Sequence, residues 1–274
     1  EILRCLVGSE MCIRDRLMDM NMVYTTFKVE KGDVVTAVNG AYALNILGLN
    51  VTVPHKQAVM ESLVDIDPLA KAIGAVNTLV RTDKGYKGYN TDILGLEREL
   101  IDEGVVLLGS RCVILGAGGA ARAIAFLCAK SGAKEIYMLN RTKEKAYDIA
   151  KAVNDYFGKE CIKPMLISEY DKLEADDYVV IQTTSVGLYP NVDDVVIDDE
   201  AFYKKVKVGV DIIYNPSETR FMKMCKNAGK PACNGLKMLL YQGVAAYELW
   251  NDVSVTKEQA DKVYNKMKEE LGIE

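Results

Sequence analysis

Residues 111–122 read RCVILGAGGAAR, and this stretch decides the fold. Its apolar start, Arg111–Leu115, predicts a strand, and Gly118–Lys130 predicts the helix that follows. The turn between them, Gly116 to Ala121, has the spacing G-x-G-x-x-A. The first glycine permits a tight turn, the second lets a pyrophosphate approach the backbone, and the small last residue lets the helix pack on the strand.

This strand–turn–helix order predicts a dinucleotide site of the Rossmann type, because the N–H groups that open the helix face the phosphates. The alternative is a tight turn in a doubly wound protein that binds nothing, and the flanking strand and helix favour the site. The predicted cofactor contacts in the turn are Gly116, Ala117, Gly118, Gly119 and Ala120.

The end of the next strand, Glu135–Leu139, selects the cofactor. NAD enzymes usually carry Asp or Glu there to bind the ribose 2′-hydroxyl. This chain has Asn140, Arg141 and Thr142 instead, and Lys143 and Lys145 follow. A guanidinium can bind a 2′-phosphate through two parallel hydrogen bonds, so Asn140, Arg141, Thr142 and Lys145 predict NADP. The alternative is that the basic residues form only the solvated first turn of a helix.

Strands and helices continue to alternate beyond this site, which predicts an α/β protein with a parallel sheet covered on both faces. The predicted elements are a helix over Lys143–Tyr156 and strands near Met165, at Val179–Gln182 and at Val206–Ile213. Two final helices, Lys237–Trp250 and Thr256–Leu271, have no strand after them. We expect them to return to the first domain.

The N-terminal part predicts a smaller α/β domain. Its expected strands are Met22–Val29, Leu49–Val53 and a hairpin of Val76–Arg81 with Tyr86–Tyr89. Its expected helices are Asp33–Leu47, one from Pro54 through Val64, and one from Asp92 to about Asp102. Glycines in the stretch Glu103–Ser110 suggest a boundary. The predicted domains are therefore residues 1–103 completed by 237–274, and a nucleotide domain over 104–236.

Composition excludes several classes of function. The 274 residues are 49% hydrophobic and 27% charged with a net charge of −5, which favours neither nucleic acid nor an anionic membrane as a partner. No apolar stretch reaches the roughly 18 residues of a membrane span, and no signal peptide is recognisable. Seven cysteines without a C-x-x-C pair predict a reducing cytoplasm. His55 is the only histidine, so we expect no metal site and no Ser-His-Asp triad.

Several motifs in a fixed order resemble shikimate dehydrogenases, over about Met22 to Trp250. They are Asn50 to Lys56 (NVTVPHK), Gly74 to Thr78 (GAVNT), Gly88 to Asp92 (GYNTD), the glycine turn, Asn140 to Thr142, Thr184 to Gly187 (TSVG), Asp211 to Pro216 (DIIYNP) and Tyr241 to Gly243 (YQG). The resemblance implies an NADP-dependent oxidoreductase that interconverts 3-dehydroshikimate and shikimate in aromatic amino-acid (chorismate) biosynthesis. A homodimer is one option for its assembly.

The resemblance also assigns roles to residues. Lys56 and Asp92 would be the catalytic pair, although a lysine after Pro54 is usually solvated and Asp92 is a competent helix cap. The other implied contacts are Thr52, Asn77, Tyr214 and Gln242 for the substrate, and Thr184, Ser185, Ile212, Gly235 and Met238 for the cofactor. His55 is expected to be structural.

The chain departs from the family pattern at its start. The family's substrate-binding Ser-x-Ser loop is missing, and Cys5 to Arg16 has the character of a foreign segment. A smaller departure is Gln182, where the family usually has Asn. Two alternatives therefore stand beside the main interpretation, a quinate/shikimate dehydrogenase and a catalytically impaired NADP-binding protein.

Overall fold

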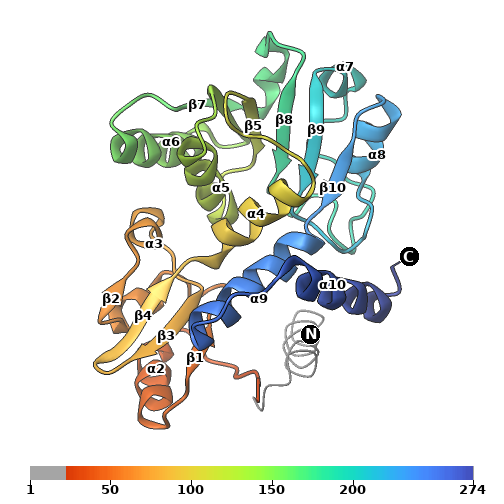
Figure 1. Ribbon diagram of the computed structural model, residues 1–274. Coiled ribbons are helices and arrows are strands. Elements are labelled where there is room, and N and C mark those ends of the chain that lie inside the picture. Colours follow the sequence, from red (N-terminus) through yellow and green to blue (C-terminus); the bar gives the residue numbers. More distant parts are fainter. Residues whose placement is uncertain (1–22, 274) are drawn as a thin grey trace. The chain divides into compact units, whose positions relative to one another are not determined.

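The computed structural model describes residues 23–273, which divide into two compact units (Figure 1). One unit runs up to Gly95 and resumes at Leu239, and the other spans Leu96–Met238. Both divisions fall within long helices, whereas the domain boundaries predicted from the sequence lie between residues 103 and 104 and between residues 236 and 237. The departures from the family pattern at Cys5 to Arg16 lie outside the described residues.

The Leu96–Met238 unit is built on a six-stranded sheet in the order β10-β9-β8-β5-β6-β7. Every pairing is parallel, as the sequence predicted. The strands are β5 (Arg111–Leu115), β6 (Glu135–Asn140), β7 (Ile162–Leu166), β8 (Tyr178–Gln182), β9 (Val206–Asp211) and β10 (Ala232–Asn234). Because β5 pairs with β6 on one side and β8 on the other, the strand order reverses there. Ligands of doubly wound sheets bind at the carboxyl ends of the strands at such a point.

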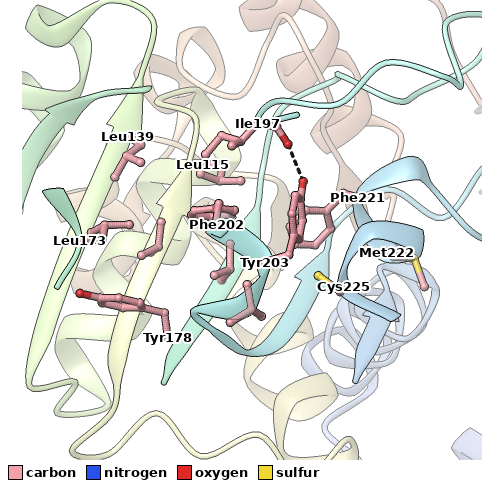
Figure 2. Close-up of a cluster of buried hydrophobic side chains, with 13 residues drawn as sticks. Leu115, Leu139, Leu173, Tyr178, Ile197, Phe202, Tyr203, Phe221, Met222 and Cys225 are labelled. Atoms are coloured by element: carbon pink, nitrogen blue, oxygen red, sulfur yellow. Dashed lines mark hydrogen bonds between the residues drawn. The ribbon is translucent and has the colours of Figure 1, made fainter. Parts of the chain in front are cut away.

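Helices cover both faces of this sheet. They are the C-terminal part of α4 (Thr91–Asp102), α5 (Gly119–Lys130), α6 (Lys143–Phe157), the short η2 (Ile167–Lys172), α7 (Glu200–Lys204), α8 (Arg220–Asn227) and the start of α9 (Leu236–Asn251). Side chains alternate between the faces of a strand. Val113 and Leu115 of β5 therefore share one face, which packs against α7 and α8. In that cluster the hydroxyl of Tyr203 donates to the Ile197 carbonyl at 2.8 Å, as Figure 2 shows.

The other unit contains a four-stranded sheet in the order β1-β3-β4-β2. Its elements are α2 (Val34–Ala43), β1 (Gly48–Asn50), η1 (Ala58–Ser62), β2 (Asp65–Ile66), α3 (Pro68–Ile73), β3 (Thr78–Thr82), β4 (Gly85–Tyr89), the start of α4, the rest of α9, and α10 (Lys257–Leu271). The predicted hairpin is β3 with β4. The C-terminal helices belong to this unit, as predicted. Trp250 on α9 donates its Nε1–H to the Leu79 carbonyl of β3 at 2.8 Å.

Two predicted elements are wrong. The described part of Met22–Val29 is not a strand, because β-rich residues form one only where a partner strand and a half-buried surface exist, and Val23 and Phe27 are exposed. The helix expected from Pro54 through Val64 is replaced by turns and by η1. Most backbone bonds of this segment span three residues, such as the one from the His55 N–H to the Thr52 carbonyl, and only the Val59 N–H reaches four residues back, to the His55 carbonyl.

Candidate functional site

A partly buried ion pair forms the centre of the candidate site in the smaller-sheet unit. Lys56 Nζ lies 2.8 Å from Asp92 Oδ2, and the two side chains are 26% and 12% exposed. The other carboxylate oxygen, Oδ1, accepts a hydrogen bond from Asn77 Nδ2 at 2.9 Å. Both oxygens of Asp92 are therefore engaged by donors, which fixes the orientation of the carboxylate. An ammonium held in this way can pass a proton to an oxygen and take one back.

Backbone hydrogen bonds bring these residues together from separate segments. The N–H of Val76 donates to the Lys56 carbonyl at 2.8 Å, and the N–H of Val51 donates to the Asn77 carbonyl at 2.8 Å. Asp92 stands in the first turn of α4, so it lies near the positive end of the helix dipole. The structure thus brings together Lys56, Asn77 and Asp92, which the sequence singled out.

The remaining predicted substrate residues are placed as follows. Thr52 is exposed in the turn that leads to Lys56, and its carbonyl accepts from the His55 N–H at 2.9 Å. Gln242 is half-buried on α9 in the same unit, and Tyr214 is half-buried after β9 in the larger-sheet unit. His55 Nε2 lies 3.0 Å from the Val29 carbonyl, which can only accept. The ring therefore anchors the segment before α2, in keeping with a structural role.

The glycine-rich turn has the form that a pyrophosphate needs. Gly116 has a φ of +110°, and a Cβ there would lie 2.7 Å from Thr183 Oγ1 and 2.8 Å from a methyl group of Thr184. Gly116 and Thr184, two predicted cofactor residues, are thus neighbours. Space is open where a Cβ of Gly118 or Gly119 would stand. Gly118 is the N-cap of α5 and supplies no side-chain cap, so the first N–H groups of the helix remain available to an anion.

The carboxyl ends of β8 and β9 are tied together behind this turn. The carboxylate of Asp211 is buried and accepts from Thr219 Oγ1 at 2.6 Å and from the Ile213 N–H at 3.0 Å. Burial raises the pKa of Asp211 to about 6, although these bonds oppose the shift. Gln182 Nε2 also donates to Asp211 at 3.3 Å. Asp211 belongs to one of the motifs noted in the sequence, but no sequence pattern indicated that the Thr219 hydroxyl would donate a hydrogen bond to it.

Two of the residues predicted beside the nicotinamide, Ile212 and Gly235, lie next to each other. A Cβ on Gly235 would lie 2.3 Å from the Ile212 carbonyl oxygen, and the Gly235 N–H donates to the Ile213 carbonyl at 3.1 Å. Only glycine allows this approach of two backbones. Met238 is buried in the first turns of α9, and Ser185 is exposed after β8. Their contact with a cofactor stays a prediction.

The basic residues that follow β6 are exposed. Arg141, Thr142 and Lys145 face solvent at the start of α6, and Asn140 Nδ2 donates to the Thr142 carbonyl at 2.9 Å. Within residues 23–273 neither Arg141 nor Lys145 forms a salt bridge. An uncommitted guanidinium at this position suits a 2′-phosphate.

A parallel sheet with an uncapped glycine turn at its switch point, and a separate unit with a lysine–carboxylate pair, define a dinucleotide-dependent oxidoreductase. Models of the shikimate dehydrogenase substrate binding domain and of shikimate / quinate 5-dehydrogenase match residues 15–79 and 100–216. The NADP(+)-dependent shikimate dehydrogenase of Moorella thermoacetica is 41% identical over 257 residues, which cover 92% of this chain and 84% of that protein. The chain belongs to the shikimate dehydrogenase family.

Solved structures agree with this assignment. A chorismate mutase/shikimate 5-dehydrogenase fusion protein from Clostridium acetobutylicum has a TM-score of 0.88 and 34% identity, covering 97% of this chain and 93% of that one. A shikimate dehydrogenase in complex with NADP+ has a TM-score of 0.84 and 35% identity, covering 94% and 90%. None of the helices within residues 23–273 is long and apolar enough to cross a membrane. The same residues contain no His, Cys, Asp and Glu cluster that could hold a metal.

Proposed function

We propose that this protein reduces 3-dehydroshikimate to shikimate with NADPH and catalyses the reverse oxidation. The observation that carries the proposal is the Lys56–Asp92 pair, with 2.8 Å between Nζ and Oδ2, in a chain of the shikimate dehydrogenase family. The alternatives, a quinate/shikimate dehydrogenase and an impaired NADP-binding protein, have no observation that favours them.

Lys56 acts as the general acid in reduction. Hydride addition to the ketone carbon leaves a negative charge on the carbonyl oxygen, and the ammonium of Lys56 stabilises this charge and donates the proton that completes the alcohol. In oxidation the neutral amine removes the hydroxyl proton. Asp92 holds the ammonium in place through one oxygen, so the lysine reaches the reacting oxygen without a search among rotamers.

Neutral polar groups orient the ring of the substrate. The Asn77 amide has a second N–H beyond the one that donates to Asp92, and this hydrogen is available to a ring hydroxyl. Thr52, Tyr214 and Gln242 supply further hydroxyl and amide groups. A polyhydroxylated ring requires such partners because each buried hydroxyl must replace its bonds to water.

NADP is held by the Leu96–Met238 unit. Residues Gly116 to Ala120 bind the pyrophosphate through backbone N–H groups at the start of α5. The 2′-phosphate is bound by Asn140, Arg141, Thr142 and Lys145. Thr184, Ser185, Ile212, Gly235 and Met238 line the nicotinamide side. When bound, the cofactor supplies the hydride. The functional domains that we propose, residues 1–103 with 237–274 for the substrate and 104–236 for the nucleotide, differ from the two compact units by a few residues at α4 and α9.

The decisive experiment compares Lys56→Ala with Lys87→Ala in a spectrophotometric assay of NADP reduction by shikimate, with quinate run in parallel. Lys87 forms a matched ion pair with Asp65 at 2.8 Å in the same unit, but that pair is more exposed. Lys56→Ala should lower kcat by about 10²–10⁴-fold with little change in NADP affinity. Lys87→Ala should leave kcat unchanged. Full turnover by Lys56→Ala, or no oxidation of shikimate by the unaltered protein, would refute the proposal.

Cytoplasmic location, homodimer formation and the absence of nucleic-acid or membrane partners remain part of the proposal. The five cysteines of the described region, at 112, 128, 161, 225 and 233, are free thiols, which suits a reducing compartment. Sedimentation velocity of the purified protein tests the assembly state.

A further inference from the structure

The oxygen of the Asn77 side chain is surrounded by donors. It accepts from the Thr91 backbone N–H at 2.8 Å, and the hydroxyls of Thr78 and Thr91 each lie 3.1 Å away. The two hydroxyl oxygens are themselves 3.1 Å apart. Thr78 and Thr91 are fully buried, so water does not compete for these bonds. On the opposite end of the amide, Nδ2 faces the carboxylate of Asp92 at 2.9 Å.

This arrangement allows only one orientation of the amide. A rotation by 180° would place the NH₂ group against the Thr91 N–H, which is a second donor, and would place the oxygen against the Asp92 carboxylate. Both contacts would then be repulsive. The correct orientation provides a bond to Asp92 and leaves one N–H for the substrate.

The two threonine hydroxyls can replace each other in this role. Thr78 Oγ1 also accepts from Asn50 Nδ2 at 3.1 Å, so its own proton points toward Asn77 or Thr91. Each hydroxyl carries one proton. In every arrangement of the two protons that uses the bonds among these three side chains, at least one reaches the Asn77 oxygen. Loss of one hydroxyl therefore leaves a hydroxyl donor at that oxygen, whereas loss of both leaves only the backbone N–H.

We propose that Thr78 and Thr91 are positioning residues that jointly fix the Asn77 amide, and through it Asp92, for the reaction. Neither hydroxyl needs to touch the substrate, because Asn77 carries their effect to the reacting groups. The inference rests on the proposed function for its kinetic test, since it assigns the two hydroxyls a part in that same site.

The test is a double-mutant cycle with Thr78→Val, Thr91→Val and the double variant. Each single change should lower kcat/KM for shikimate by no more than about threefold, less than a full hydrogen bond can contribute, because the remaining hydroxyl still donates to the Asn77 oxygen. The double variant should lose about thirtyfold, more than the roughly ninefold product of the two, because the hydroxyls replace each other. NADP affinity should stay unchanged. A double Ser variant keeps both hydroxyls and should restore activity.

Thr82→Val is the matched control. Thr82 lies at the other end of β3, and its hydroxyl donates to the Gly85 carbonyl at 2.8 Å in the hairpin turn. The same chemical change there should leave kcat/KM unaltered. If the two site substitutions combine as a simple product, or if the double Ser variant is as impaired as the double Val variant, the joint role is refuted.

An NMR measurement does not depend on activity. The Asn77 carboxamide proton that is bonded to Asp92 should exchange slowly with water in the unaltered protein, and in the double Val variant it should exchange at least about tenfold faster. Unchanged exchange would overturn the inference even if the unaltered protein oxidised no shikimate. Faster exchange together with an inactive unaltered protein would support the fixed amide and refute the proposed function.

Discussion

Asp92→Asn should inactivate the protein without unfolding it. The replacement keeps the shape of the side chain but offers one acceptor and one NH₂ group to two donors, Lys56 Nζ at 2.8 Å and Asn77 Nδ2 at 2.9 Å. One of these contacts therefore becomes donor against donor. The side chains of the ion pair are 26% and 12% exposed, so water replaces the lost partner poorly.

The magnitude follows from the bond that is lost. A hydrogen bond between charged partners contributes about 1.5–3 kcal/mol, which corresponds to roughly a 10- to 150-fold loss in kcat/KM for shikimate. Because Asp92 holds the proton donor, the loss should fall mainly on kcat. NADP affinity should remain within about twofold of the unaltered protein, since no predicted cofactor contact changes.

The assay follows NADPH formation with shikimate, and calorimetry measures NADP binding. Glu97→Gln is the control, because Glu97 is a carboxylate on the same helix whose ion pair with Lys130, at 3.2 Å, is more exposed. Such a pair contributes little, so Glu97→Gln should keep full turnover. A kcat for Asp92→Asn within about twofold of the unaltered protein would show that the carboxylate does not position Lys56.

Two further predictions concern the other unit. Arg141→Ala should weaken NADP binding by about tenfold or more while NAD binding stays the same, because only NADP has the 2′-phosphate; equal losses for both cofactors in calorimetry would contradict this. Glu99 is fully buried, and neither of its oxygens has a hydrogen-bond partner among residues 23–273. Burial, followed by the charge of Glu103, therefore raises its pKa well above the ordinary value. The folded state keeps a proton that the unfolded state releases, so stability falls as pH rises above about 4.5, by up to about 1.4 kcal/mol per pH unit. Glu99→Gln should remove this dependence and so raise the free energy of unfolding at pH 8 relative to the unaltered protein. Urea unfolding measures this free energy at pH 5 and pH 8, and the same change between the two pH values in both proteins would refute the prediction.

Most of the parallel sheet was predictable because strands such as β5 and β8 are apolar runs placed between helices, whereas the short edge strand β10 (Ala232–Asn234) was not predicted. Arg111–Leu115 matches β5, and the glycine turn that follows fixes where the sheet reverses. The segment Met22–Val29 has equally β-rich residues, yet its described part forms no strand. Local composition does not contain the pairing partner that a strand needs.

The contacts among the candidate site residues were likewise not predictable from local sequence. Lys56 and Asp92 are 36 residues apart, and nothing local in the sequence indicates that their side chains would meet; the motif resemblance supplied that expectation. Thr78 and Thr91 were quoted only as members of motifs. Their role depends on a three-way contact among β3, α4 and Asn77 that no periodicity encodes.

Gln182 shows how the structure accommodates a departure from the family pattern. It is fully buried at the end of β8, where the family usually has Asn. Its amide group donates to the Val186 carbonyl at 3.2 Å and to Asp211 at 3.3 Å, and its oxygen accepts from the Thr184 N–H. One side chain thus links the segment that carries Thr184 to the end of β9, from which Ile212 follows. Because its polar atoms are paired, the longer side chain is no evidence of lost function, and it connects two strand ends that the proposed cofactor site requires.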